Sequence, residues 1–420
     1  MDRRRFLTAS ALAAPLVTAA AAPAAADDPP HPHEPVIPGA DDAAAAGWRA
    51  LVGHEVAVVA NHTATLRDGT HIVDSMVAAG VRPRAIFGPE HGFRGTAQAG
   101  GSTGDHPDPR TGIQVYDAYT LTEDELAEHF LYAGIDLVVF DIADVGARFY
   151  TYIWTMYTAM RAAARVDAAF LVLDRPNPIG GEASGPVLDP AFASPVGRLP
   201  IALRHGMTTG ELAALFQAEF LPEQPAAEHL AELTVVPARG WRRDRFFADT
   251  GLGWILPSPN MPTADTALVY PGTGLFEGTL LSEGRGTTRP FEIIGAPGID
   301  WHWAEALNDL GLPGVRFREH YFQPTFDKFT GQACGGVQVH VTDARRFAAV
   351  ETAVAMIVAL RRTHPAVFGW RPDDHVDRLF GSDRLRRQVS AGADTDEIVG
   401  GWAEELTRFR ERRRPYLRYP

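Results

Sequence analysis

The stretch IDLVVFDIADVGARFYTYIW, residues 135–154, carries the pattern from which the fold is predicted. Its first part, residues 135–142, is an apolar run of strand length, and its end continues into a helical pattern. A strand that is apolar on both faces is typical of a parallel sheet covered by helices on both sides. Asp141 and Asp144 lie between the strand and the helix. The stretch therefore indicates an α/β fold with acidic side chains at the end of a strand.

The same alternation extends to both sides of this stretch. Further apolar runs of strand length lie at residues 55–61, 84–88, 168–174 and 233–238. Helical patterns occupy residues 69–80, 122–134, 150–165 and 208–220. Strands separated by amphipathic helices predict a Rossmann-like parallel-sheet domain over residues 47–255. Two of the helices begin with capping boxes, Thr122 with Glu125 and Thr208 with Glu211, so we expect those glutamates to be structural.

The composition changes after residue 255. The next segment, up to residue 298, is dense in Gly, Pro and Thr and predicts long ordered loops. Strand patterns at 314–322 and 334–343, a helical pattern at 345–362 and a basic C-terminal helix follow. We therefore predict a smaller α+β domain over residues 256–420, with an active-site cleft between the two domains.

Bulk properties exclude several classes of protein. The 420 residues carry a net charge of −13, which does not favour nucleic-acid binding. Cys334 is the only cysteine, so the chain can form neither an internal disulfide nor a multi-cysteine metal site. The segment GTGLFEG (272–278) has only the glycine spacing of a dinucleotide fingerprint, and no phosphate-binding loop, G-x-S-x-G or H-E-x-x-H motif occurs. We predict no cofactor.

The N-terminus resembles an export signal. Arg3 and Arg4 are followed by Phe6-Leu7 and an Ala/Leu-rich stretch that ends at a small-residue cleavage site, which predicts a signal peptide of the twin-arginine type over residues 1–26. Residues 27–46 are rich in Pro, His and Asp and are predicted to be disordered. We expect an exported protein that is periplasmic, extracellular or cell-wall associated, with no stable membrane insertion once the signal is removed.

Polar side chains follow four of the predicted strands. In chain order these are Asn61 and His62, then Glu90 and His91, then Asp141 and Asp144, and finally Asp174, Arg175 and Asn177. In an open parallel sheet, ligands bind outside the carboxyl ends of the strands. We therefore predict a polar binding site at this edge of the sheet.

Glu90 is the candidate for acid–base chemistry. It lies in IFGPEHGFRG (86–95), where Phe87, Pro89 and Phe93 are its apolar neighbours. An apolar environment favours the protonated carboxyl group that a general acid needs. The alternative is a loop carboxylate paired with Arg94.

Other candidates have structural alternatives of similar weight. Asp144 can act chemically or cap the following helix, and Arg148 can hold a carboxylate or pair with Asp144. Asn177 lies in a turn-forming Pro-Asn-Pro segment. Glu283 and Arg285 lie in a glycine-rich loop that permits close approach to a ligand, or they pair with each other.

Several long motifs together resemble one bacterial family. They are FGPEHGFRG, FDIADVGARFYTYIWTM, LDRPNPIGG, GMTTGELA, PSPNMPT, YPGTGLFEGTLLSEGRGTTRPFE and the terminal YLRY. They are similar to those of the DUF1343 family, which is associated with exo-β-N-acetylmuramidases of the NamZ type, glycoside hydrolase family 171. The resemblance covers about residues 47–420. One departure is Ala143, where family members often carry Gln.

The resemblance implies hydrolysis of β-1,4-linked N-acetylmuramic acid (MurNAc) at non-reducing ends of peptidoglycan fragments, so MurNAc-GlcNAc saccharides are the expected partners. It implies Glu90 as the catalytic glutamate, which we interpret as the general acid. The second group is left open among Asp144, Asp141, Glu283 and the 2-acetamido group of the substrate. Candidates for the lactyl carboxylate are Arg94, Arg148 and Arg285. The further substrate-binding candidates are Asn61, His91, Asp141, Tyr152, Asn177 and Asn260.

Two other functions are consistent with the same residues. An exported protein could bind peptidoglycan fragments in this cleft without turnover. A metal-dependent hydrolase could use His62, His91 and His205 with Asp141 or Asp144, although their spacing is not diagnostic.

Overall fold

The computed structural model describes residues 34–222 and 229–420, and residues Glu34–Pro420 form one compact unit. The predicted signal peptide, residues 1–26, and the start of the segment that follows it lie outside the described residues. No helix in the described part of the chain is both long enough and apolar enough to cross a bilayer.

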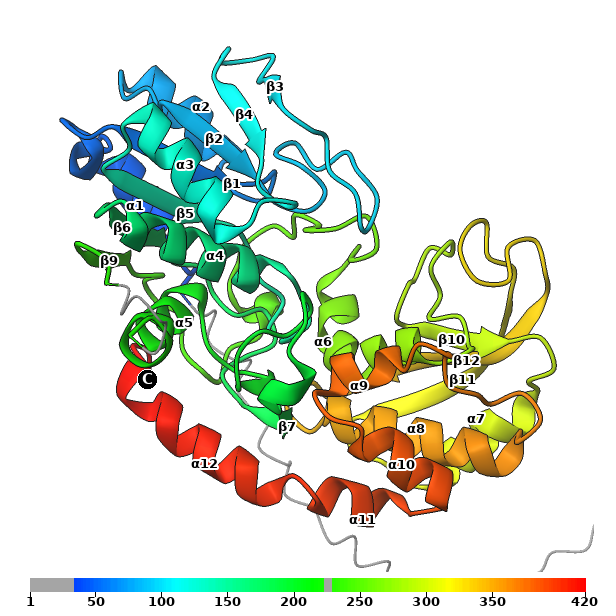
Figure 1. Cartoon of the computed structure of the whole chain (residues 1–420). Helices are drawn as coiled ribbons and strands as arrows, with labels where there is room; N and C mark the ends of the chain where they lie inside the picture. Colours follow the sequence, from blue (N-terminus) through cyan, green and yellow to red (C-terminus); the bar gives the residue numbers. More distant parts are fainter. Residues whose placement is uncertain (1–33, 223–228) are drawn as a thin grey trace, which may run out of the picture. The chain divides into compact units, whose positions relative to one another are not determined.

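A seven-stranded sheet has the order β3-β4-β2-β1-β5-β6-β9 (Figure 1). All neighbouring strands are parallel except β3, which pairs antiparallel with β4 at one edge. The strands are β1 (Val56–Ala60), β2 (Ala85–Gly88), β3 (His106–Pro107), β4 (Gln114–Asp117), β5 (Leu137–Asp141), β6 (Ala169–Leu173) and β9 (Leu233–Val236). The predicted parallel-sheet α/β class is confirmed, whereas β3 and β4 were not predicted.

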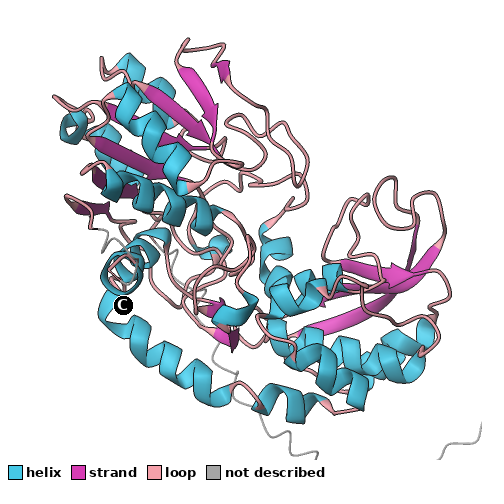
Figure 2. Cartoon of the chain, viewed as in Figure 1, coloured by secondary structure: helices cyan, strands magenta, loops and turns pink. Residues whose placement is uncertain are grey.

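Side chains of successive strand residues enter two separate cores. In β5, Val138 and Phe140 pack in one core, and Leu137 and Val139 pack in the other. This alternation follows from the two-residue repeat of a strand and shows that both faces of the sheet are covered. The covering helices include α2 (Ile72–Ala78), α3 (Glu123–Ala133), α4 (Tyr152–Arg165) and α5 (Thr209–Leu215) (Figure 2). Both predicted capping boxes, at α3 and α5, are present.

The segment predicted to be disordered is ordered from residue 34 onward. Ile37 pairs with Arg239, and helix α1 (Gly39–Ala45) follows it. The backbone N–H of Gly39 donates to the carbonyl of Asp174 over 2.9 Å, at the carboxyl end of β6. The prediction of disorder is wrong here because it rested on composition, while the segment is held by contacts with residues far away in the sequence.

The second half contains an antiparallel sheet of order β10-β12-β11. Its strands are β10 (Ile293–Ala296), β11 (Val315–Phe322) and β12 (Cys334–Val341). The accompanying helices are α7 (Trp301–Asp309), α8 (Ala349–Thr363), α9 (His375–Phe380), α10 (Arg384–Ala391), α11 (Thr395–Gly400) and α12 (Ala403–Arg413). The smaller α+β part is thus confirmed, while the predicted boundary at residues 255/256 stays a prediction.

The segment predicted as long loops after residue 255 contains a helix. Helix α6 (Ala264–Thr273) runs directly into a 3-10 turn (Gly274–Gly278). Pro271 lies inside α6 and has no N–H to donate to the carbonyl of Ala267, yet the helix continues through it to Thr273. A Cβ atom at Gly272 would lie 2.0 Å from the carbonyl oxygen of Ala349, so glycine is required for close packing of α6 on α8.

The chain end returns to the first sheet. The hydroxyl of Tyr419 donates to the carboxylate of Asp174 at the end of β6, and Arg413 of α12 donates to the carbonyls of His205 and Gly206. A hairpin of β7 (Ser184–Val187) and β8 (Ala202–Arg204), also not predicted, lies in the same half of the chain.

Candidate active site

A cavity draws its lining from the carboxyl end of β2, the start of α4 and the segment 258–291. Its polar lining residues are Glu90, His91, Tyr150, Thr151, Tyr152, Ser258, Asn260, Tyr270, Glu277 and Arg285. Phe149, Met261 and Phe291 are among its apolar lining residues. The predicted residues Glu90, His91, Tyr152, Asn260 and Arg285 therefore share one cavity, formed by both halves of the chain.

Glu90 is held at both carboxylate oxygens. The backbone N–H of Gly100 donates to one oxygen over 2.7 Å, and the hydroxyl of Thr151 donates to the other over 2.7 Å. The alternative pairing with Arg94 is wrong, because Arg94 binds Asp108 over 2.9 Å and Asp74 over 3.3 Å. Arg94 is also absent from the cavity lining, so the structure does not place it as the predicted substrate ligand.

The turn after Glu90 has an unusual backbone. His91 has a positive φ of 70°, a conformation that few residues other than glycine adopt. Its ring Nδ1 donates to the carbonyl of Ala97 over 2.9 Å, and its backbone N–H donates to the carbonyl of Gly101 over 2.9 Å. These bonds close the loop 91–101 on itself and so present the N–H of Gly100 to Glu90.

Three tyrosines form an aromatic wall beside Glu90. The ring centroid of Tyr150 lies 5.0 Å from that of Tyr152 and 5.8 Å from that of Tyr270, in both cases edge to face. The hydroxyl of Tyr152 donates to the carbonyl of Pro257 over 2.6 Å. Burial raises the pKa of all three phenols above the ordinary value, so they are neutral hydrogen-bond donors at physiological pH. Such a wall suits the apolar face of a ring-shaped ligand.

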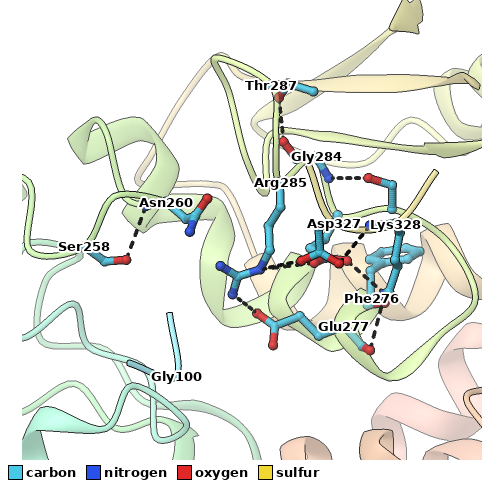
Figure 3. Close-up of polar contacts among 12 residues, drawn as sticks. Gly100, Ser258, Asn260, Phe276, Glu277, Gly284, Arg285, Thr287, Asp327 and Lys328 are labelled. Carbon is cyan, nitrogen blue, oxygen red and sulfur yellow. Dashed lines mark hydrogen bonds and ion pairs between the residues drawn. The ribbon is translucent and has the colours of Figure 1, made fainter. Parts of the chain in front are cut away.

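A second carboxyl group, Glu277, lies in the cavity and was missed by the sequence analysis. Arg285 donates to Glu277 over 2.9 Å (Figure 3). Its Nε lies 3.2 Å from a carboxylate oxygen of Glu283. Burial raises the pKa of Glu277, and the nearby Arg285 opposes this effect. Glu277 belongs to GTGLFEG, which was considered as a dinucleotide fingerprint and as part of a family motif but not as a source of a catalytic carboxyl group, and the segment was predicted as loop. The other polar lining residues that were missed are Thr151, Ser258 and Tyr270.

Buried amide nitrogens without a partner lie at or near the cavity. Asn260 is 4% exposed, and its side-chain nitrogen has no hydrogen-bond partner among residues 34–222 and 229–420. The same holds for the side-chain nitrogen of Asn61, whose oxygen accepts from the backbone N–H of Thr63 over 2.9 Å. Buried polar groups are normally paired, so Asn260 offers a donor suited to a ligand oxygen. Asn61 lies outside the lining.

Asp144 lines a different, neighbouring cavity. This cavity has a volume of about 350 Å³ and includes Ala143, Arg175 and Trp254 in its wall. Asp144 accepts from the backbone N–H of Gly146 over 2.8 Å and from His205 over 3.1 Å. The alternative role as a helix cap is wrong, because α4 begins after Thr151. Ala143, the departure from the family motif noted in the sequence, therefore lines this second cavity.

Glu283 and two other predicted site residues lie outside the lining of the Glu90 cavity and have structural partners. Glu283 is bound by Lys328 over 2.9 Å as well as by Arg285. Asp141 pairs with Arg175 over 2.8 Å and is fully buried. Asn177 accepts from the backbone N–H of Ile179 over 3.1 Å within its turn, and it donates to the carbonyl of Met207, in a distant segment, over 2.9 Å.

Arg148 is also structural. It is fully buried and donates to the carbonyls of Pro186, Ile201 and Leu379 at 2.9–3.0 Å. Burial lowers its pKa to about 9. The alternative pairing with Asp144 is wrong, because the guanidinium donates to three backbone carbonyls. Arg148 is also absent from the lining of the Glu90 cavity, so the structure does not place it as the predicted ligand of a substrate carboxylate.

The histidines considered for a metal site are separated by their contacts. His62 donates to the carbonyl of Leu256 over 2.7 Å, while His205 binds Asp144. In the described part of the chain no group of three or more His, Cys, Asp or Glu side chains is arranged to hold a metal ion.

Comparisons with known proteins point to one family. Residues 56–265 match the N-terminal part of "Exo-beta-N-acetylmuramidase NamZ", and residues 268–419 match its C-terminal part. The peptidoglycan beta-N-acetylmuramidase NamZ of Bacillus subtilis (strain 168) is 47% identical over 341 residues, which cover 81% of this chain and 80% of that relative.

Two crystal structures of DUF1343 proteins from Bacteroides fragilis NCTC 9343 are similar to the chain. One has a TM-score of 0.83 and 30% identity, over 93% of this chain and 100% of the other. The second has a TM-score of 0.73 and 31% identity, over 92% of this chain and 99% of the other.

Proposed function

The chain belongs to the family of NamZ exo-β-N-acetylmuramidases and is a glycoside hydrolase, and we propose that it releases MurNAc from the non-reducing ends of peptidoglycan fragments. The observation that carries this proposal is the cavity that holds two carboxyl groups, Glu90 and Glu277, beside an aromatic wall. Glycoside hydrolysis uses two carboxyl groups that flank the scissile bond.

In the proposed mechanism Glu90 protonates the glycosidic oxygen while positive charge develops on the sugar ring. The bonds from Gly100 and Thr151 hold its carboxyl group in one orientation. A positioned proton donor accelerates such reactions by roughly 10²–10⁴-fold.

Glu277 is the proposed second carboxyl group. Of the candidates considered from the sequence, Asp141 and Glu283 lie outside the cavity lining. Asp141 pairs with Arg175, Glu283 pairs with Lys328 and Arg285, and Asp144 lines the neighbouring cavity. The 2-acetamido group of the substrate is the alternative nucleophile, and in that case Glu277 orients this group.

One observation favours exchanging the two roles. Burial raises the pKa of Glu277, which keeps its proton to higher pH and suits a proton donor. Glu90 would then act as the carboxylate. The activity of each variant on substrates with different leaving groups distinguishes the two assignments. A leaving group that needs no protonation restores activity to the variant that lacks the general acid, and it does not restore activity to the other variant.

Arg285 is the proposed ligand of the lactyl carboxylate, the group that distinguishes muramic acid from glucosamine. It is the only one of the three predicted arginines in the cavity lining. Its guanidinium carbon lies 5.1 Å from the centre of the Phe291 ring, which fixes the plane in which its N–H groups point.

The test is hydrolysis of nitrophenyl β-N-acetylmuraminide by the wild type, Glu90→Gln and Glu277→Gln. We expect turnover by the wild type, a loss of about 100-fold or more in each variant, and recovery of the acid variant on a dinitrophenyl glycoside. Full activity of Glu90→Gln contradicts its catalytic role. Binding of MurNAc without turnover by the wild type favours the non-catalytic binding protein, and activity lost with a chelator favours the metal-dependent hydrolase.

We further propose export by the twin-arginine route, on the basis of Arg3, Arg4 and the apolar stretch that follows. Cell fractionation after replacement of both arginines by lysine tests this. Retention of the variant inside the cell is the expected result, and unchanged export contradicts it.

A further inference from the structure

We infer that Lys328 is a positioning residue of the active site, which fixes Glu277 and Arg285 by capping one helix end and by binding Glu283. The inference rests on the proposed function of the cavity. Lys328 itself is absent from the cavity lining, so it acts through the residues that it holds.

The composition of the chain singles this residue out. Of its 39 basic Lys and Arg residues, 38 are arginine, and Lys328 is the only lysine. All 38 remaining positions of this kind are arginine, so Lys328 is the one site at which the chain carries a lysine ammonium group. This site should therefore require a property in which lysine differs from arginine.

The ammonium group of Lys328 is surrounded by oxygen atoms. It lies 2.8 Å from the carbonyl oxygen of Leu281, 3.1 Å from that of Thr279, and 2.9 Å from a carboxylate oxygen of Glu283. The carbonyl oxygens of Phe276 and Glu277 lie at 3.3 and 3.4 Å. A compact ammonium with three rotatable donors fits such a shell, whereas a planar guanidinium directs its donors into a fork.

Two of these carbonyls, those of Phe276 and Glu277, lie at the end of a helical segment, and those of Thr279 and Leu281 lie in the residues that follow it. Helix α6 continues into the turn Gly274–Gly278, and the last carbonyls of a helix lack the N–H partners that its interior carbonyls have. The carbonyl of Phe276 accepts from the N–H of Thr279, and Lys328 adds a charged donor at this end. A positive charge at this end stabilises the helix through its dipole as well. The same helical segment carries Tyr270 and Glu277, so Lys328 caps the element that presents both to the cavity.

A chain of ion pairs links Lys328 to the cavity (Figure 3). Glu283 accepts from Lys328 with one oxygen, and its other oxygen lies 3.2 Å from Nε of Arg285. Arg285 in turn donates to Glu277 over 2.9 Å. Without Lys328, the nearly buried carboxylate of Glu283 would compete with Glu277 for Arg285.

The loop that carries Lys328 is held in a demanding conformation. Its two neighbours, Asp327 and Phe329, both have positive φ, of 68° and 59°. The backbone N–H of Thr325 donates to the carbonyl of Gly286 over 3.0 Å, which ties this loop to the loop of Arg285. Two strained residues around one side chain are consistent with a loop built to place that side chain.

The first test compares Lys328→Arg and Lys328→Met with the wild type, and Arg408→Lys serves as a control exchange at an exposed ion pair with Glu404. We expect Lys328→Arg to lose about 10–100-fold in kcat/KM, mainly in kcat, because small displacements of catalytic groups cost this much. The control variant Arg408→Lys should have the kcat and KM of the wild type. A Lys328→Arg enzyme with wild-type kcat and KM overturns the inference.

The pH profile separates positioning from a purely structural role. The charged or titratable groups around Glu277 are Arg285, Glu283, Lys328 and Tyr270, and His375 lies near Lys328. The charge of Lys328 lowers the pKa of Glu277. In a plot of kcat/KM against pH, the limb that reflects ionisation of Glu277 should therefore move to higher pH in Lys328→Met. Lys328→Arg keeps the charge and should not move it. Identical limbs in all three enzymes contradict the inference.

Amide hydrogen exchange tests the inference by a measurement that does not depend on catalytic activity. Amide exchange of residues 276–285 should become faster in Lys328→Arg than in the wild type and in Arg408→Lys. Unchanged exchange overturns the inference even if the enzyme is active. A wild type without turnover, but with faster exchange in Lys328→Arg, contradicts the proposed function and leaves the positioning role supported.

Discussion

The hydroxyl of Thr151 donates to the carboxylate of Glu90 over 2.7 Å and thereby joins the start of α4 to the end of β2. Thr151 is the N-cap residue of α4, yet its side chain makes no capping bond to the helix. N-cap hydroxyls normally accept from the helix backbone. This hydroxyl instead serves the cavity, so its loss should affect catalysis more than stability.

We therefore expect Thr151→Val to lower kcat about tenfold, because a hydrogen bond to a charged group contributes about 1.5 kcal/mol. Its thermal midpoint should stay close to that of the wild type. Thr155→Val, one turn further along α4, is the matched control, since its hydroxyl meets only the carbonyl of Thr151 at 3.5 Å. Equal loss of kcat in both variants contradicts the assignment.

Asp144 tests the choice of the second carboxyl group. Because Asp144 lines the neighbouring cavity and binds Gly146 and His205, Asp144→Asn should lower kcat less than about tenfold. Glu277→Gln should lower it about 100-fold or more. Steady-state kinetics of the two variants on the same aryl glycoside measure the difference. The reverse order would return Asp144 to the catalytic role considered from the sequence.

The fold could be predicted from the sequence because local pattern and burial agree. In the run 135–142, apolar residues occupy both faces of the predicted strand. The run forms β5 (Leu137–Asp141), whose side chains pack in both cores. The capping box of Thr122 and Glu125 could also be predicted, because the residues that define it lie within four consecutive positions. Helix α6 was missed because its stability comes from packing on α8, which no local pattern shows.

The site could be predicted only in part. Strand ends identified Glu90 and His91, since the position of a strand end follows from the strand itself. The position of a strand end does not, however, determine the direction in which a nearby side chain points. Arg148 was predicted to face the cleft, yet backbone carbonyls from distant segments surround it, while Glu277 lies on the helix that was predicted as loop.

Arg148 should matter for stability and not for binding. Arg148→Met leaves buried carbonyls of Pro186, Ile201 and Leu379 without this donor and should lower the free energy of unfolding by about 3 kcal/mol. Urea denaturation measures this, with Arg408→Met as the exposed control. The KM of the folded variant should be unchanged. A stable variant with a raised KM would restore the substrate-binding role predicted from the sequence.

Glu277 should make stability depend on pH in a defined direction. Burial raises its pKa in the folded state above the unfolded value, so the folded state binds the proton more tightly. The stabilisation is complete below the unfolded pKa and is lost as pH rises through the folded pKa. Glu277→Gln cannot ionise, so its free energy of unfolding should fall less over this range than that of the wild type.

Glu55 provides the control of opposite sign for this pH dependence. Its bond with Arg84 lowers its pKa, so its contribution is present above the unfolded pKa and is lost as pH falls. Urea denaturation of wild type, Glu277→Gln and Glu55→Gln at a series of pH values gives the three slopes. Relative to the wild type, Glu277→Gln should lose less stability on the alkaline side, and Glu55→Gln should lose less on the acid side. A Glu277→Gln curve parallel to the wild type at every pH would mean that Glu277 has the same pKa in the folded and unfolded states, and the reversed assignment of the two carboxyl groups would then lose its support.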